Sequence, residues 1–78
     1  MRKPTKPFAV CMDNQGNEAS LIPGKLYRVR SDARAAKDGL LRIVDESGED
    51  YLYDARQFVL VDFPQTVRRR ILALQRAS

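Results

Sequence analysis

Short apolar runs separated by polar turns fill most of the chain. Two such runs flank an acidic turn at residues 45–50, and a four-residue break, Asp54 to Gln57, leads into a third run, Phe58 to Val61. Strands joined by connections this short form an antiparallel meander, which must curl on itself to bury its apolar face. The pattern therefore predicts a small β-barrel.

Two earlier runs complete the predicted strands, which lie at residues 8–12, 25–30, 40–45, 50–53 and 58–61. In the second run, Tyr27 and Val29 alternate with Leu26 and two arginines. Because arginine is rarely buried without a partner, we expect Tyr27 and Val29 to face the core. Tyr51 and Tyr53 share one face of the fourth run.

The connections carry weaker helical signals. Residues 54–57 have the length of a single 3₁₀ turn. Residues 31–39 are rich in alanine, with a candidate cap in Ser31 or Asp32, but an isolated helix of this length is marginal. We therefore predict a loop containing one turn between the second and third strands.

After Phe63 the apolar period changes from two residues to that of a helix. Phe63, Val67, Ile71 and Leu74 recur at spacings of four, four and three, whereas Leu72 falls on the polar side. We expect a C-terminal helix whose apolar stripe covers the barrel. Docking of the helix on a partner, or contact between its arginines and nucleic acid, remain as alternative interpretations.

The domain prediction follows from these elements. A chain of 78 residues is one domain with a small core. We expect a flexible basic leader at residues 1–7, a barrel at 8–63, and a helix packed on the barrel at 64–78. The predicted fold class is mainly β, a five-stranded barrel with a C-terminal α-helix.

Two segments carry a family resemblance. Tyr53 to Val59 resembles the segment after the distal hairpin of Src-homology-3 domains, with one extra residue and with Asp54 in place of proline. The run DESGEDYLY, Asp45 to Tyr53, resembles short bacterial proteins of unassigned function, over about residues 8 to 67. The resemblance implies a Src-homology-3-like barrel and supplies no activity. The chain lacks the tryptophan and the first-loop aromatic motif of the peptide-binding family.

The inventory of reactive groups argues against catalysis. The sequence has no histidine, which is the commonest general base, and its single cysteine, Cys11, lies in an apolar run. We expect a non-enzymatic protein without cofactor or metal. The acidic turn matches no calcium-binding loop. One cysteine and the lack of a long apolar segment favour the cytoplasm and argue against a membrane partner.

Charge is distributed unevenly along the chain. Residues 7–63 hold seven basic and ten acidic side chains, so the predicted barrel carries a net charge of −3 between basic ends. Weak nucleic-acid binding through those ends is therefore the second hypothesis for function. The basic residues concerned are Lys3, Lys6, Arg68, Arg69, Arg70 and Arg76.

The first hypothesis is a protein-interaction module with an unknown protein partner. Three aromatic side chains near the predicted loops, together with the acidic hairpin, form the expected surface. Its residues are Tyr51, Tyr53, Phe58, Asp45, Glu46, Glu49 and Asp50.

Overall fold

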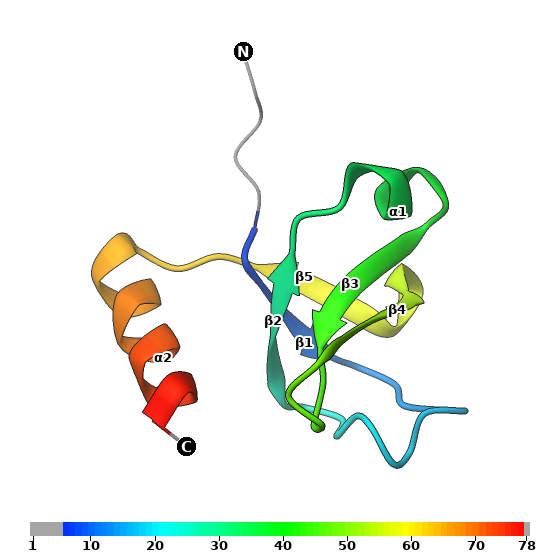
Figure 1. Cartoon of the computed structure of the whole chain (residues 1–78), viewed down its shortest axis with the longest axis horizontal. Coiled ribbons are helices and arrows are strands. Elements are labelled where there is room, and N and C mark those ends of the chain that lie inside the picture. Colours follow the sequence, from blue (N-terminus) through cyan, green and yellow to red (C-terminus); the bar gives the residue numbers. More distant parts are fainter. Residues whose placement is uncertain (1–5, 78) are drawn as a thin grey trace.

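The structure, a computed structural model, describes residues 6–77, and the side chains of these up to residue 75. Five antiparallel strands form one sheet in the order β4-β3-β2-β1-β5, with a helix following the last strand (Figure 1). The elements are β1 Phe8–Cys11, β2 Leu26–Arg30, α1 Ala33–Lys37, β3 Leu40–Val44, β4 Asp50–Asp54, η1 Ala55–Gln57, β5 Phe58–Val61 and α2 Gln65–Ala77. The predicted five strands, the 3₁₀ turn and the C-terminal helix are confirmed.

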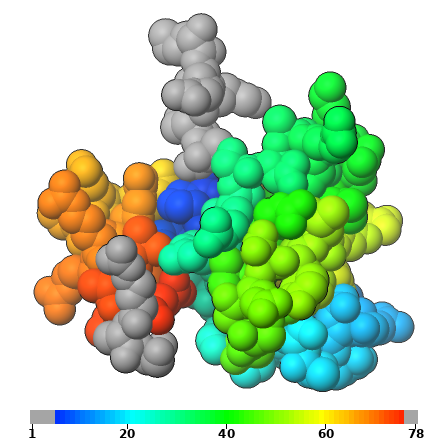
Figure 2. Space-filling view, viewed as in Figure 1, coloured from blue at the N-terminus to red at the C-terminus, as the bar shows by residue number. Residues whose placement is uncertain are grey.

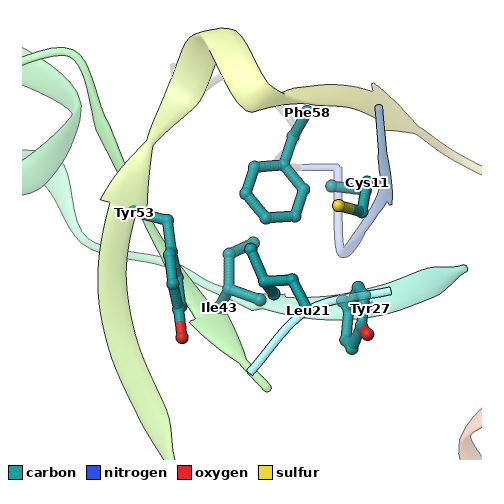
Figure 3. Close-up of a cluster of buried hydrophobic side chains, with 7 residues drawn as sticks. Cys11, Leu21, Tyr27, Ile43, Tyr53 and Phe58 are labelled. Atoms are coloured by element: carbon teal, nitrogen blue, oxygen red, sulfur yellow. The ribbon is translucent and has the colours of Figure 1, made fainter. Parts of the chain in front are cut away.

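The inner face of the sheet holds the core. Strand pairing sets Cys11 opposite Phe58 and Ala9 opposite Tyr27, so that side chains from several strands meet on one side. Leu21, from the long loop between β1 and β2, points into the same cluster (Figure 3). The buried members are Ala9, Cys11, Leu21, Tyr27, Ile43, Tyr53 and Phe58. Tyr27 and Val29 face this core, as their alternation predicts.

The outer face of the sheet is apolar as well. Phe8 is completely buried there, and its ring meets that of Phe63 edge-on, with 5.7 Å between centroids. Val10 and Leu26, which pair across β1 and β2 on the same face, are half-buried. Helix α2 lies alongside this side of the sheet, next to β1 and β2 (Figure 2). A sheet with two apolar faces needs such a cover.

Strands β4 and β5 are the two outer strands of the sheet. No ladder joins them within residues 6–77, so the five strands form a strongly curved but open sheet. The 3₁₀ helix η1 links them directly, and the rings of Tyr53 and Phe58 meet on the inner side at 6.2 Å between centroids. The inner cluster lies on one side of this five-stranded sheet, and the barrel inferred from the short connections stays a prediction.

The segment between β2 and β3 differs from its prediction as a loop. Residues Ala33–Lys37 form the short helix α1, which begins after Asp32. The Asp32 carboxylate accepts a hydrogen bond from the Ala35 amide at 2.9 Å, and Arg42 Nε of β3 donates to the same carboxylate at 2.9 Å. Burial of Ala35 adds a further tertiary contact. These contacts stabilise a helix that would be marginal in isolation.

Helix α2 is rotated relative to the orientation that its apolar stripe predicts. Ile71 is half-buried, but Val67 is 40% and Leu74 69% exposed, whereas Leu72, predicted on the polar side, is half-buried. Arg68 is half-buried too. At about 100° per residue, the face turned to the sheet lies about a quarter turn from the centre of the stripe. Phe63, the first residue of the stripe, packs on Phe8, but Val67 and Leu74 are exposed, so the stripe as a set does not form the contact with the sheet.

The predicted leader meets the sheet at residue 7. The Pro7 carbonyl, directly before β1, accepts a hydrogen bond from the Val29 amide of β2 at 2.8 Å. Lys6 is exposed. The rest of the predicted leader, residues 1–5, lies outside the described residues.

Candidate functional site

The predicted aromatic surface does not form. Tyr53 and Phe58 are each only 7% exposed and belong to the inner core, whereas Tyr51 is 50% exposed. Tyr51 and Tyr53 do share a face of β4, but Tyr51 lies beyond the part of that face which the core covers. The prediction was wrong for Tyr53 and Phe58 because the curvature of an open sheet cannot be read from alternation alone.

Asp45 was assigned to the same surface and is instead buried. One carboxylate oxygen accepts hydrogen bonds from the Ser47 amide and hydroxyl at 2.8 and 2.6 Å, and the other accepts from the Tyr53 hydroxyl at 2.5 Å. Burial works to raise the pKa of Asp45, but these bonds outweigh it and lower the pKa below its usual value. Asp45 therefore closes the β3–β4 turn onto the core.

Glu46 is bound to its own sheet. Its carboxylate accepts from Lys25 Nζ at 2.6 Å and from the Tyr27 hydroxyl at 2.5 Å. The Lys25 contact, followed by the Tyr27 bond, lowers the pKa of Glu46. Burial, together with the Glu46 bond, raises the pKa of the Tyr27 phenol. The Tyr27 hydroxyl also accepts from the Ile22 amide at 2.8 Å, which ties the long loop to β2.

The two remaining acidic residues of the hairpin also have partners within the chain. Glu49 accepts from the Tyr51 hydroxyl at 2.9 Å, and Asp50 pairs with Arg42 at 3.3 Å. Glu49 is exposed, Asp50 half-buried. The acidic cluster is thus mainly a set of intramolecular contacts, and Tyr51 remains as the exposed aromatic residue among the described side chains.

The predicted basic ends are only partly visible. Lys3 and the side chain of Arg76 lie outside the described residues. Arg68 pairs with Asp62 at 2.9 Å, and its Nε atom is buried with no hydrogen-bond acceptor among the described atoms. Arg69 and Arg70 are exposed, and neither forms an ion pair within the described part of the chain.

A groove separates the C-terminal half of α2 from the outer face of the sheet. It has a volume of about 650 Å³. Leu26 of β2 and Val44 of β3 supply apolar walls, and Leu74 of α2 stands at its rim. Lys25, Arg28 and Glu46 line it with charge, and the turn residues 45–48 close one end. The groove is therefore lined by both apolar and charged side chains.

Sequence reasoning missed this groove. The available signal was the uninterrupted apolar run Phe8–Cys11, since a run without alternation indicates a strand covered on both faces. A second covered face requires a covering element, and α2 is the one element left to supply it. The alternation of β2 does place Leu26 and Arg28 opposite the core, but it does not show that α2 stands beside them.

Three further features concern potential metal ligands, the single thiol and the helices. Among the described residues, no cluster of three or more potential metal ligands occurs. Cys11 is fully buried, and burial raises the pKa of its thiol, which opposes formation of the reactive thiolate. Within residues 6–77 no helix has both the length and the apolar character needed to cross a membrane.

Comparisons with known proteins leave the family open. No family model matches the chain, and neither the search of curated proteins nor that of solved structures found a match.

Proposed function

We propose that this protein is a non-enzymatic interaction module with a Src-homology-3-like barrel fold and that it binds a partner protein through helix α2 and the adjoining groove. The fold proposal is supported by the strand order β4-β3-β2-β1-β5, by η1 between β4 and β5, and by the resemblance of residues 45–59. A bacterial, cytoplasmic setting belongs to the same proposal.

One observation carries the functional proposal. The apolar stripe of α2 is rotated by about a quarter turn from the side that faces the sheet, which leaves Leu74, a residue lining the groove, 69% exposed. Val67, one helical heptad earlier, is 40% exposed. These side chains do not belong to the inner core, so a partner can bury them without disturbing that core.

The mode of binding differs from that of peptide-binding Src-homology-3 domains. Those domains dock extended proline-rich segments on exposed aromatic rings. Here Tyr27, Tyr53 and Phe58 are buried, and the exposed ring of Tyr51 donates its hydroxyl hydrogen bond to Glu49. The proposed surface therefore lies on the outer face of the sheet, beside α2.

Nucleic-acid binding is a second candidate. Lys6, Arg69 and Arg70 favour it, because all three are exposed and none forms an ion pair among the described residues. Single-stranded nucleic acids also need stacking platforms within a positive surface. The exposed ring of Tyr51 lies on β4 beside Glu49 and Asp50, so its immediate surroundings are acidic rather than positive. We therefore rank this function second.

Affinity capture with a matched pair of variants tests the first proposal. Leu74→Asp places a charge in the apolar rim, whereas Ala73→Asp adds the same charge one position earlier, on the exposed back of α2. Proteins captured from a bacterial lysate by the wild type and by Ala73→Asp, but lost with Leu74→Asp, are the expected result. Thermal melting monitors the fold of each variant. Equal recovery with both variants would overturn the proposed surface, and capture that disappears after nuclease treatment would favour nucleic acid.

A further inference from the structure

The open stripe of α2 has the spacing of a coiled-coil seam. Val67, Ile71 and Leu74 follow one another at intervals of four and three residues, which is the d-a-d pattern of a heptad. In a helix these three side chains span about 10 Å. Val67 and Leu74 are exposed and Ile71 is half-buried, so the seam is accessible along its length.

The positions that flank the seam carry positive charge. With Ile71 at position a, Arg68 occupies position e and Arg70 position g, the two positions whose charges select the partner helix. Residues 63–78 include four arginines and no acidic side chain. Arg70 is exposed without an ion pair among the described residues. Arg28 also lines the groove, together with Lys25 and the acidic Asp45 and Glu46.

We propose that the partner segment is an acidic amphipathic helix, with apolar residues at heptad spacing and glutamate or aspartate beside them, which packs along α2 and continues into the groove. This inference rests on the proposed function and specifies its partner. Carboxylates on the partner would pair with the exposed Arg70, since Arg68 already pairs with Asp62. Its apolar residues would contact Val67, Ile71 and Leu74. Its next apolar residue would enter the groove beside Leu26 and Val44.

The same charges argue against two other occupants. A second copy of α2 packed antiparallel would bring Arg70 against Arg70 at position g, which disfavours self-pairing, and a copy packed parallel would offer Arg70 no carboxylate, since α2 has none. Adsorption on an anionic membrane needs a wide apolar face that can be buried between lipids. Leu72 and Ile71 are half-buried, so Val67 and Leu74 are the exposed apolar side chains of α2 that could insert into a membrane. A partner helix fits this narrow stripe better.

A designed peptide pair tests the inference on the full-length chain. The acidic probe is a fluorescently labelled three-heptad peptide with leucine at a and d and glutamate at e and g. The control peptide is identical except for lysine at e and g. Anisotropy titrations should show saturable binding of the acidic peptide, at least tenfold tighter than that of the basic peptide, and weaker at higher salt.

Three variants locate the binding. Leu74→Asp should lower the affinity for the acidic peptide at least tenfold, whereas Ala73→Asp should change that affinity less than threefold. Arg70→Glu should reduce the preference for the acidic peptide over the basic one, because it reverses the charge at position g. All three substitutions are at exposed positions, and their melting temperatures check the fold.

Each outcome decides between the proposals. Equal affinity for the two peptides would overturn the proposal that the partner is an acidic helix. An affinity that Leu74→Asp leaves unchanged would overturn it too. Binding to vesicles with one fifth phosphatidylserine, without binding to the acidic peptide, would show a lipid surface instead. If lysate capture depends on Leu74 while the acidic peptide does not bind, the interaction function stands and the acidic helix fails. If neither depends on Leu74, both proposals fail.

Discussion

The hydrogen bonds of Asp45 allow a quantitative test of whether this residue stabilises the fold or serves a partner. Its buried carboxylate accepts three hydrogen bonds, from the amide and hydroxyl of Ser47 and from the hydroxyl of Tyr53. A hydrogen bond to a charged group contributes about 1.5–3 kcal/mol. Tyr53→Phe removes one such bond and keeps the ring against Phe58, so we expect the free energy of unfolding to fall by about 1.5 kcal/mol.

Asp45→Ala should lower the free energy of unfolding about twice as much, by roughly 3 kcal/mol, because it leaves both Ser47 and the Tyr53 hydroxyl without their acceptor. If the two residues act through their shared bond, the double variant should cost about the same as Asp45→Ala alone. The coupling free energy would then be about 1.5 kcal/mol, well above the roughly 0.5 kcal/mol error of additivity.

Urea denaturation followed by circular dichroism measures these differences. With a slope of about 1 kcal/mol per molar urea for a small domain, Tyr53→Phe should lower the midpoint by roughly 1.5 M. The coupling should fade at acid pH. Since the fold lowers the pKa of Asp45, its contribution is present above the unfolded pKa of about 4 and is lost as the pH falls through the folded pKa. A coupling below 0.5 kcal/mol at neutral pH would refute the reasoning.

Three further predictions concern the core and its ionisable groups. Ile43→Ala should cost about 3–4 kcal/mol and the half-buried Ile71→Ala about 1 kcal/mol, as measured by urea denaturation; equal losses would show that α2 belongs to the main core. The fold raises the pKa of Tyr27 and Tyr53, so their contribution is present below about pH 10 and is lost as the pH rises through the folded pKa. The melting temperature should therefore decline above pH 10, and a constant value up to pH 11.5 would contradict this. Cys11 should react with a thiol reagent only after addition of denaturant, and rapid labelling of the folded protein would contradict its burial.

Local patterns were sufficient to predict the elements. The alternation in β2 identified Tyr27 as a core residue, and the change of period after Phe63 identified the helix that the structure places at Gln65–Ala77. Such patterns reflect the geometry of a single strand or helix, in which side-chain direction follows from sequence spacing alone. The short helix α1 was missed because its stability depends on Arg42, which follows it in the sequence on another element.

The candidate site depended on relations between elements. Tyr51 and Tyr53 are both tyrosines and lie on the same face of β4. Curvature of the sheet nevertheless leaves Tyr51 exposed and Tyr53 buried. From the sequence, Asp45 is expected to be a solvated turn residue. In the structure, the hydroxyl of Tyr53, eight positions later, donates a hydrogen bond to its carboxylate.

What the sequence by itself determined was the set of strands, the C-terminal helix, the apolar stripe and the positive charge beside it. The tertiary structure alone decided which way that stripe faces. Phe63 covers Phe8 at the start of α2, and this contact helps to fix a rotation that places Arg68 and Leu72 toward the sheet and leaves Leu74 at the rim of the groove. Helical spacing fixes which residues share a face, but the packing of one element on another fixes whether that face is covered.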